Sequence, residues 1–111
     1  MKLEAPRVLT PSIMSFDREV LNSDLPVLVD FWTPWCAPCQ TLKPRLEAMV
    51  DELEGKARTA FVNIDSHPEL ADRFDIKSIP ALRLFREGRL VDGHNGVLTT
   101  AALRDFFEKA L

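Results

Sequence analysis

The sequence predicts an α/β fold, in which a central mixed β-sheet of three parallel-type strands plus a C-terminal antiparallel hairpin is flanked by about four helices. Residues 27–32 are apolar apart from one carboxylate, which is typical of a central strand covered on both faces. Strand-like and helix-like stretches alternate as far as residue 74, as expected for parallel strands joined by crossover helices. The apolar runs 81–85 and 89–91 are then joined through Glu87-Gly88, which is the spacing of an antiparallel hairpin.

The first part of the chain is expected to form an edge strand and a short helix. Val8 and Leu9 make a small apolar patch whose extension Pro11 limits, as is common at a sheet edge. Ser15 is expected to cap a helix from residue 16 to about residue 22, because serine side chains accept backbone N–H bonds at helix starts. Acidic residues follow in the first turn, where the helix dipole favours them.

A long helix is predicted from residue 35 to residue 53, shortly after the central strand. Its apolar positions recur at intervals of three and four, and Gly55 follows as a stop. Pro38 fits the first turn, where the backbone N–H has no helical partner in any case. Pro44 falls inside the helix and is expected to kink it.

A second buried strand is predicted over residues 59–65. Ser66 and Glu69, which follow it, have the spacing of a capping box. We therefore expect a short helix that begins there and ends at Phe74.

The last part of the chain is expected to bend after the hairpin and end in a helix. Gly93 and Gly96 are expected to bracket the bend, and Thr99 is predicted to cap the helix. The inward face of this helix is apolar and consists of Ala102, Leu103, Phe106, Phe107 and Ala110.

Composition and charge limit the classes of protein to which the chain can belong. With 111 residues, of which 46% are hydrophobic, it is expected to form one domain over residues 1–111 with a core of its own. A net charge of −3, without a block of like charge, disfavours nucleic acid and anionic membranes as partners. No apolar run approaches the roughly 20 residues that span a bilayer, and residues 1–7 lack the apolar core of a secretion signal. We therefore expect a cytoplasmic protein, and we expect it to be a monomer.

The two cysteines are the strongest chemical signal. Cys36 and Cys39 are three residues apart at the start of the predicted long helix, within reach of an intramolecular disulfide. Such a pair in a chain with an adequate core is more often redox-active or metal-binding than structural. Zinc and iron–sulfur sites need about four ligands, and the other candidates, His67 and His94, are far apart in sequence. The ligand count therefore favours a redox-active pair.

The two cysteines are expected to have different roles. Cys36, at the N-terminus of the helix, lies beside unpaired backbone N–H groups and the positive end of the helix dipole, which stabilise a thiolate. Cys36 is therefore the candidate nucleophile. Cys39, one turn further in, is the candidate resolving thiol, which attacks a mixed disulfide on Cys36.

Asp30 is the one carboxylate in the central strand, six residues before Cys36. We expect it to lie beneath the disulfide in apolar surroundings, where loss of solvation raises the pKa of a carboxyl group. A carboxylate tuned in this way can accept the proton of Cys39, directly or through one water. The alternative is a structural aspartate that is hydrogen-bonded to the backbone.

Several short motifs occur together in one order: Asp30-Phe31-Trp32, Trp35-Cys36-Ala37-Pro38-Cys39, Pro44, Asn63-Ile64-Asp65, Ile79-Pro80 and Gly96. With these motifs the chain resembles the thioredoxin family over nearly its whole length. The resemblance implies a thioredoxin fold and reversible reduction of protein disulfides by the two cysteines. It also implies a cis peptide bond before Pro80, with Pro80 packed against the cysteines. A substrate-docking rim is implied around an exposed Cys36 sulfur, formed by Trp35, Pro38, Ile79, Pro80 and Gly96.

The resemblance further implies partners for a general protein disulfide reductase. The expected electron donor is a flavin- and NADPH-dependent thioredoxin reductase. The expected acceptors include ribonucleotide reductase, peroxiredoxins and other oxidised proteins. No bound cofactor is expected, because the dithiol itself carries the electrons.

Three residues depart from the family pattern. Ala37 replaces the usual glycine between the cysteines, whereas Gln40 and Phe61 stand where many members carry basic residues. Both of the latter remove positive charge from the site. Unless another cation substitutes, we expect Asp30 to be harder to ionise and the Cys36 thiolate to be less favoured.

Two other functions stay open. A disulfide oxidase or isomerase would use the same chemistry, although Ala37-Pro38 does not resemble the Pro-His or Gly-His usual in those branches. A binding or scaffold subunit would use the fold to dock a partner, with thiol chemistry incidental. Replacing both cysteines by serine separates this last function from the others, because a scaffold would keep its role.

Overall fold

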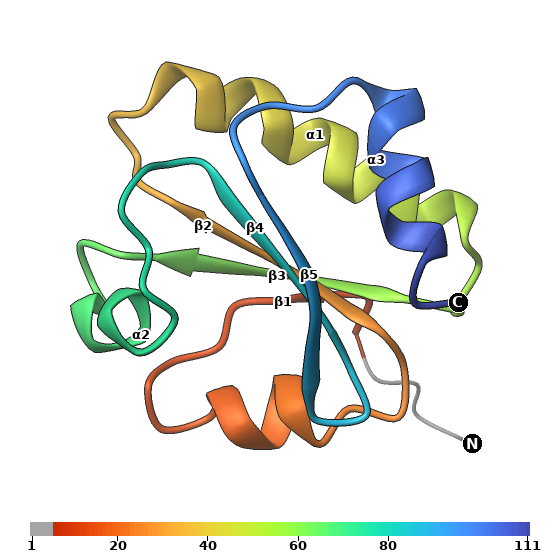
Figure 1. Cartoon of the computed structure of the whole chain (residues 1–111), viewed down its shortest axis with the longest axis horizontal. Helices are drawn as coiled ribbons and strands as arrows, with labels where there is room; N and C mark the ends of the chain where they lie inside the picture. Colours follow the sequence, from red (N-terminus) through yellow and green to blue (C-terminus); the bar gives the residue numbers. More distant parts are fainter. Residues whose placement is uncertain (1–5) are drawn as a thin grey trace.

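A five-stranded mixed sheet runs through the centre of the computed structural model, which describes residues 6–111 (Figure 1). The strands are β1 (Val8–Leu9), β2 (Val27–Trp32), β3 (Arg58–Asn63), β4 (Ala81–Arg86) and β5 (Arg89–Asn95), in the sheet order β1-β3-β2-β4-β5. Strands β1, β3 and β2 are parallel, whereas β4 is antiparallel to β2 and β5. The predicted mixed sheet, with β2 in its middle, is confirmed. Most of the segment considered above for a secretion signal lies outside the described residues.

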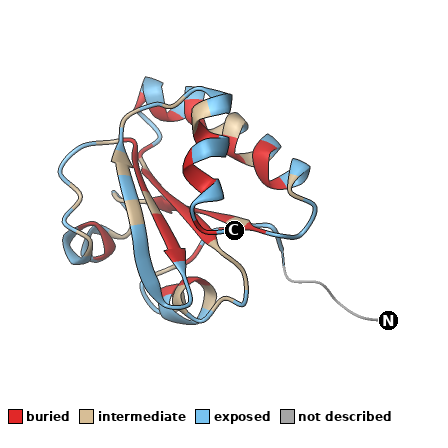
Figure 2. Ribbon diagram, turned by 45° about the vertical axis from the view of Figure 1, so that its right-hand side comes forward, coloured by how far each residue is buried: buried red, intermediate tan, exposed pale blue. Residues whose placement is uncertain are grey.

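Within residues 6–111, four helices cover the two faces of this sheet. They are η1 (Asp17–Leu21), α1 (Ala37–Glu52), α2 (Pro68–Arg73) and α3 (Thr100–Glu108). Helices α1 and α3 lie together on one face, and η1 and α2 lie on the other (Figure 1). Buried residues follow the inner strands and the inward sides of the helices (Figure 2).

The alternation of side chains along β2 decides which groups face which helices. Leu28 belongs to the core cluster under α1 and α3, whereas Val29 and Phe31 belong to the cluster on the opposite face. Because successive side chains of a strand point to opposite faces, Asp30 and Trp32 face α1 as Leu28 does. The strand therefore delivers its one carboxylate to the same face as the helix that carries the cysteines.

The hairpin forms where it was predicted, but its second strand is longer than expected. Glu87 and Gly88 both have positive φ, 52° and 77°, which is the geometry that matches a two-residue turn to the strand twist. Gly93 lies within β5, so the expectation that it brackets a bend is wrong. A Cβ at Gly93 would lie 3.1 Å from the side chain of Arg83, and a glycine therefore leaves room for that side chain on the neighbouring strand.

Two predicted helix caps are wrong. Ser15 does not cap η1, because its hydroxyl accepts the backbone N–H of Ser12 at 2.9 Å within the preceding turn. Ser66 does not open α2 either, since Pro68 occupies the first helical position and the cap residue is His67, which makes no side-chain cap bond. Proline is suited to that position and moves the helix start beyond the capping-box spacing.

The prolines of α1 and the cap of α3 lie where they were predicted. Pro38 lies in the first turn of α1 as expected, and Pro44 lies inside the helix, where the kink stays a prediction. The cap of α3 is confirmed, because the Thr99 hydroxyl accepts the backbone N–H of Ala102 at 3.1 Å.

Replacement of Thr99 by alanine is expected to lower the free energy of unfolding by about 1 kcal/mol, because one backbone N–H of α3 loses its partner. Urea unfolding of the oxidised protein measures this change. Thr100→Ala is the matched control, since Thr100 is the next residue, is exposed and is already inside the helix. Equal effects of the two substitutions would contradict the cap.

Candidate active site

The cysteines form a disulfide at the N-terminus of α1. Cys36 and Cys39 are joined with their Cα atoms 5.2 Å apart. Cys36 is the N-cap residue of α1, with extended backbone, and its Sγ accepts the backbone N–H of Cys39 at 3.2 Å. A sulfur that accepts an N–H bond at the positive end of a helix is stabilised as a thiolate once the disulfide is reduced. The helix begins two residues later than predicted because Cys36 caps it.

The surroundings of the two sulfurs differ in part from expectation. Cys39 is 2% exposed, as expected for the inner cysteine, but Cys36 is also buried, at 6%. The expectation of an exposed Cys36 is therefore not met in this disulfide form. The residues on either side of Cys36 are exposed, and Trp35 is 73% exposed.

Trp35 is held by Asp65, which the sequence indicated only as the last residue of the Asn63-Ile64-Asp65 motif. The indole Nε1 of Trp35 donates to Asp65 Oδ2 at 2.9 Å. Asp65 lies just after β3, and its own backbone N–H donates to Asn63 Oδ1 at 3.0 Å. Because β2 and β3 are parallel neighbours, their carboxyl ends lie side by side. Trp35 follows β2 and Asp65 follows β3, so the order of the strands could have indicated that these two residues lie close together.

The predicted cis bond before Pro80 is present, between Ile79 and Pro80. Pro80 is buried, and its carbonyl oxygen accepts the backbone N–H of Gly96 at 2.8 Å. The structure thus joins two of the expected docking residues, although they are 16 positions apart in the sequence. Contact of Pro80 with the cysteines, and of the rim with substrate, stays a prediction.

Asp30 is fully buried on the α1 side of the sheet, and neither of its carboxylate oxygens has a hydrogen-bond partner among the described residues. The alternative of an aspartate hydrogen-bonded to the backbone is therefore wrong. Burial raises the pKa of Asp30 from its ordinary 3.8 to about 7, an effect that the charge of Lys43 partly opposes. At neutral pH the group is thus divided between its protonated and ionised forms.

The site keeps a positive charge despite the departures from the family pattern. Phe61 is buried and uncharged, and Gln40 donates its side-chain N–H to the carbonyl oxygen of Pro34 at 3.1 Å. Lys43, on α1, places its Nζ 5.4 Å from the ring centroid of Trp32 and 5.3 Å from that of Phe61. Lys43 therefore supplies a cation whose charge acts on Asp30, and no motif or spacing in the sequence indicated this.

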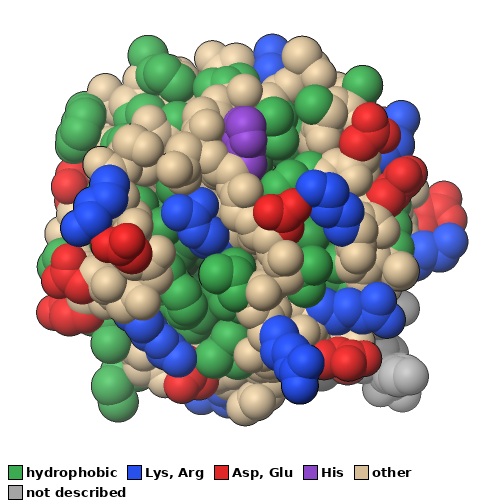
Figure 3. All heavy atoms as spheres, in the orientation of Figure 1, with side chains coloured by type: hydrophobic (Ala, Val, Ile, Leu, Met, Phe, Trp, Pro, Cys, Tyr) green, Lys and Arg blue, Asp and Glu red, His purple; other side chains and the backbone are tan. Residues whose placement is uncertain are grey.

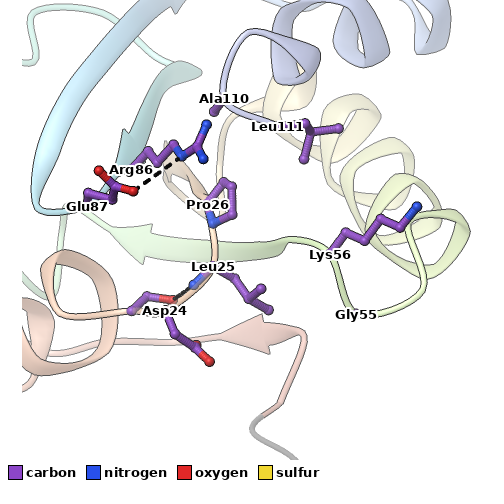
Figure 4. A pocket seen from close by; sticks show the side chains of 10 residues that line it. Asp24, Leu25, Pro26, Gly55, Lys56, Arg86, Glu87, Ala110 and Leu111 are labelled. Carbon is purple, nitrogen blue, oxygen red and sulfur yellow. Dashed lines mark hydrogen bonds and ion pairs between the residues drawn. The ribbon is translucent and has the colours of Figure 1, made fainter.

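One hollow among the described residues lies away from the disulfide. It has a volume of about 420 Å³ and is lined by loop residues next to the start of β2 together with the chain end that follows α3 (Figure 4). The cysteines follow the carboxyl end of β2, whereas this hollow lies beside its amino end, so the two are at opposite ends of the strand. Within residues 6–111, no group of three or more His, Cys, Asp or Glu side chains is placed to hold a metal ion.

The outer surface offers no block of one charge on the face seen in Figure 3, where acidic and basic side chains are intermixed. This mixture agrees with the near-balanced composition of the sequence. In the described part of the chain, every helix is too short or too polar to cross a bilayer.

The fold and the site together define a class of protein. A disulfide at the N-terminus of the helix after the central strand, on the same sheet face as a buried carboxyl group, is the machinery of a thiol-disulfide oxidoreductase.

Comparison with known proteins specifies the family. The thioredoxin family model matches residues 7–109. The chain is 42% identical to thioredoxin 1 of Nostoc sp., over 87% of this chain and 91% of the relative. It is 40% identical to a thioredoxin of Synechocystis sp., over 92% and 97% respectively. The chain belongs to the thioredoxin family, and family membership implies a thioredoxin reductase and disulfide-containing clients as its general partners.

The raised pKa of Asp30 predicts how stability depends on pH. Between pH 3.8 and about 7 the folded state holds a proton that the unfolded state has lost, so the free energy of unfolding falls as pH rises. The total loss is expected to be about 4 kcal/mol, and it ends above pH 7. In Asp30→Asn this slope is expected to disappear, which makes the variant more stable than the wild type at pH 8.

Urea unfolding of the oxidised proteins from pH 5 to pH 8 measures this difference. Asp24→Asn serves as control, because Asp24 is exposed, its pKa is lowered by Arg58, and its titration lies below this range. Parallel pH curves for wild type and Asp30→Asn would contradict the prediction.

Proposed function

We propose that the protein is a general protein disulfide reductase, in which Cys36 is the nucleophile, Cys39 the resolving thiol and Asp30 the proton acceptor. The observation that carries the proposal is the N-cap position of Cys36, whose Sγ accepts a backbone N–H of α1. A thiolate is the reactive form in thiol-disulfide exchange, and this position favours it.

The first half of the reaction takes place at Cys36. Its thiolate attacks one sulfur of a client disulfide, so that a bond forms between Cys36 and the client while the client S–S bond breaks. The first client sulfur leaves as a thiolate and is then protonated. The product is a mixed disulfide between the protein and the client.

The second half releases the client. Asp30 takes the thiol proton of Cys39, directly or through one water, and the resulting thiolate attacks Cys36 Sγ. The Cys36–Cys39 bond forms, the bond from Cys36 to the client breaks, and the second client sulfur leaves as a thiolate. Two electrons have then passed from the dithiol to the client, and the disulfide seen in the structure is the oxidised product.

Clients dock on the surface beside Cys36. Trp35, with its exposed ring, and Gly96, next to the exposed Val97, border this surface together with Pro38, Ile79 and Pro80. An extended client segment would lie along the backbone near Pro80 and pair with it as an added strand does. A flat apolar surface of this kind accepts many targets weakly, which suits a general reductase.

The redox cycle requires a donor. A flavin- and NADPH-dependent thioredoxin reductase would return electrons to the Cys36–Cys39 disulfide, with ribonucleotide reductase and peroxiredoxins among the clients. The protein would work as a monomer in the cytoplasm, without a bound cofactor, in electron transport and cell redox homeostasis. Sequence identity of about 40% to proteins named thioredoxin over most of the chain supports this assignment.

The reduction potential of the Cys36/Cys39 couple decides between a reductase and an oxidase or isomerase. We expect a value near or below about −270 mV, which is reducing against the cytosolic glutathione poise. Equilibration in glutathione buffers, with thiol alkylation read as a gel shift, gives the value. A potential of about −180 to −120 mV would show an isomerase or oxidase and overturn the proposal while leaving the fold unaffected.

The assignment of roles to the cysteines predicts a trapping result. Cys39→Ser should accumulate mixed disulfides on Cys36, because the thiol that releases the client is absent. Its catalysed rate of disulfide reduction should fall to the rate without protein. Non-reducing gels of the variant after incubation with a disulfide-containing protein measure the trapped species.

Cys36→Ser is the matched control, and it should trap nothing. Accumulation on Cys39 in that variant would reverse the assignment. If the double serine variant kept the cellular role of the protein, the chain would instead be a scaffold.

A further inference from the structure

Within the sheet, Asp30 lies among apolar neighbours. Asp30 is the only charged residue of β2, and its partners in the sheet register are Phe61 on β3 and Leu82 on β4. Both partners are buried and apolar. The sheet itself therefore supplies no charge within the first neighbours of this carboxyl group.

The other elements packed against this face contribute few titratable groups. On α1, Cys39 is buried and Lys43, four positions later on the same side of the helix, is half-buried. On α3 the inward side chains are apolar, and Arg104 and Asp105 are exposed.

The outer strands add no further charge near Asp30. On β4, Arg83 shares the face of Val29 and points away from Asp30. On β5, His94 shares the face of Asp30, but it lies two strands away, with its ring 6.4 Å from that of Phe106. Of the cations within residues 6–111, Lys43 is the one whose charge acts on Asp30.

Lys43 is held by aromatic rings rather than by a carboxylate. Its Nζ lies 5.4 Å from the ring centroid of Trp32 and 5.3 Å from that of Phe61, within the range of cation–π attraction. Phe61 is the register partner of Asp30, and Trp32 lies two residues after Asp30 on β2, on the same face of the sheet. No ion pair of Lys43 occurs among residues 6–111, so aromatic contacts hold its charge beside Asp30 without cancelling it.

A hollow lies on the solvent side of this group. It has a volume of about 180 Å³ and is lined by Trp32, Lys43 and Phe61 and by residues near the start of α2. Lys43 is half-buried, so its ammonium keeps access to solvent while Asp30 has none. The positive charge of Lys43, at the border of the solvent, therefore acts on a carboxyl group that has no contact with solvent itself.

We propose that Lys43 is a positioning residue for the second half of the reaction: its ammonium, clamped over Trp32 and Phe61, keeps buried Asp30 able to ionise and so to accept the Cys39 proton. The proposal rests on the proposed function, because it gives Lys43 its role through Asp30. It gives the site a cation near Asp30 although positions 40 and 61 carry Gln and Phe. Lys43 itself contacts neither sulfur nor client in this role.

The first test is the titration of Asp30 in the oxidised protein, followed through its carboxyl carbon by NMR. This measurement needs no activity, so its failure is separate from a failure of the reductase function. Lys43→Met keeps an unbranched apolar stem and removes the charge, and it is expected to raise the pKa of Asp30 by about one unit. Lys43→Arg keeps the charge and is expected to titrate like the wild type.

Lys56→Met is the matched control, because it removes one exposed lysine beyond the end of α1, beside the hollow at the other edge of the sheet. It should leave the Asp30 titration unchanged. Coincident curves for wild type and Lys43→Met would overturn the proposal, as would equal shifts in Lys43→Met and Lys56→Met. Lys43→Gln provides a second neutral variant if the methionine variant does not fold.

The second test is the pH profile of client release from a preformed mixed disulfide on Cys36. In Lys43→Met its midpoint is expected to move upward together with the Asp30 titration, with a loss of up to about tenfold in rate at pH 7. Lys43→Arg should restore the wild-type profile. A shifted titration with an unchanged release profile would overturn the role in the reaction.

Discussion

The covering of both faces of β2 is the constraint on which the rest of the structure depends. Two core clusters, one under α1 and α3 and one against η1 and α2, exclude water from every side chain of this strand except the half-buried Trp32. The carboxyl group of Asp30 loses its hydration there and gains no hydrogen bond from any described residue, which is why its pKa is raised to about 7. The core that stabilises the fold therefore also creates the proton acceptor.

The same packing places the helix that carries the thiols. Helix α1 lies over the face to which Asp30 points, and it begins near the carboxyl end of β2. Cys36 therefore lies at a helix start, where backbone N–H groups have no helical partner, and Cys39 lies one turn further in. The two cysteines therefore differ in environment, because Cys36 is the cap residue of α1 whereas Cys39 lies inside the helix.

Electrostatic tuning in this site comes from few groups. Burial raises the pKa of Asp30, and Lys43 opposes that effect from a position set by two aromatic rings. Stability and reactivity are coupled through the same carboxyl group, since its ionisation at neutral pH lowers the free energy of unfolding. A substitution of Asp30 that removes this ionisation is therefore expected to raise the free energy of unfolding and to remove the proton acceptor.

Much of the fold and the chemical core of the site could be predicted from the sequence. The sheet, the long helix and the hairpin follow from apolar periodicity, and the spacing of Cys36 and Cys39 indicates their disulfide without reference to the rest of the chain. These features are local, because each depends on residues that are close together in the chain. The capping residues Ser15 and Ser66 were misassigned because the Ser15 hydroxyl accepts the N–H of Ser12 in the preceding turn, and because Pro68 begins α2 one residue later than the capping box requires.

The remaining features depended on tertiary structure, because they join residues that are distant in sequence. Asp65 holds the indole of Trp35 across 30 positions, and Gly96 binds the carbonyl of Pro80 across the end of the sheet. The orientation of Lys43 over Phe61 depends on how α1 packs on β3. The sequence by itself determined which groups carry the chemistry, whereas only the packing of helix on sheet decided which charge acts on Asp30, since electrostatic interaction depends on distance in space.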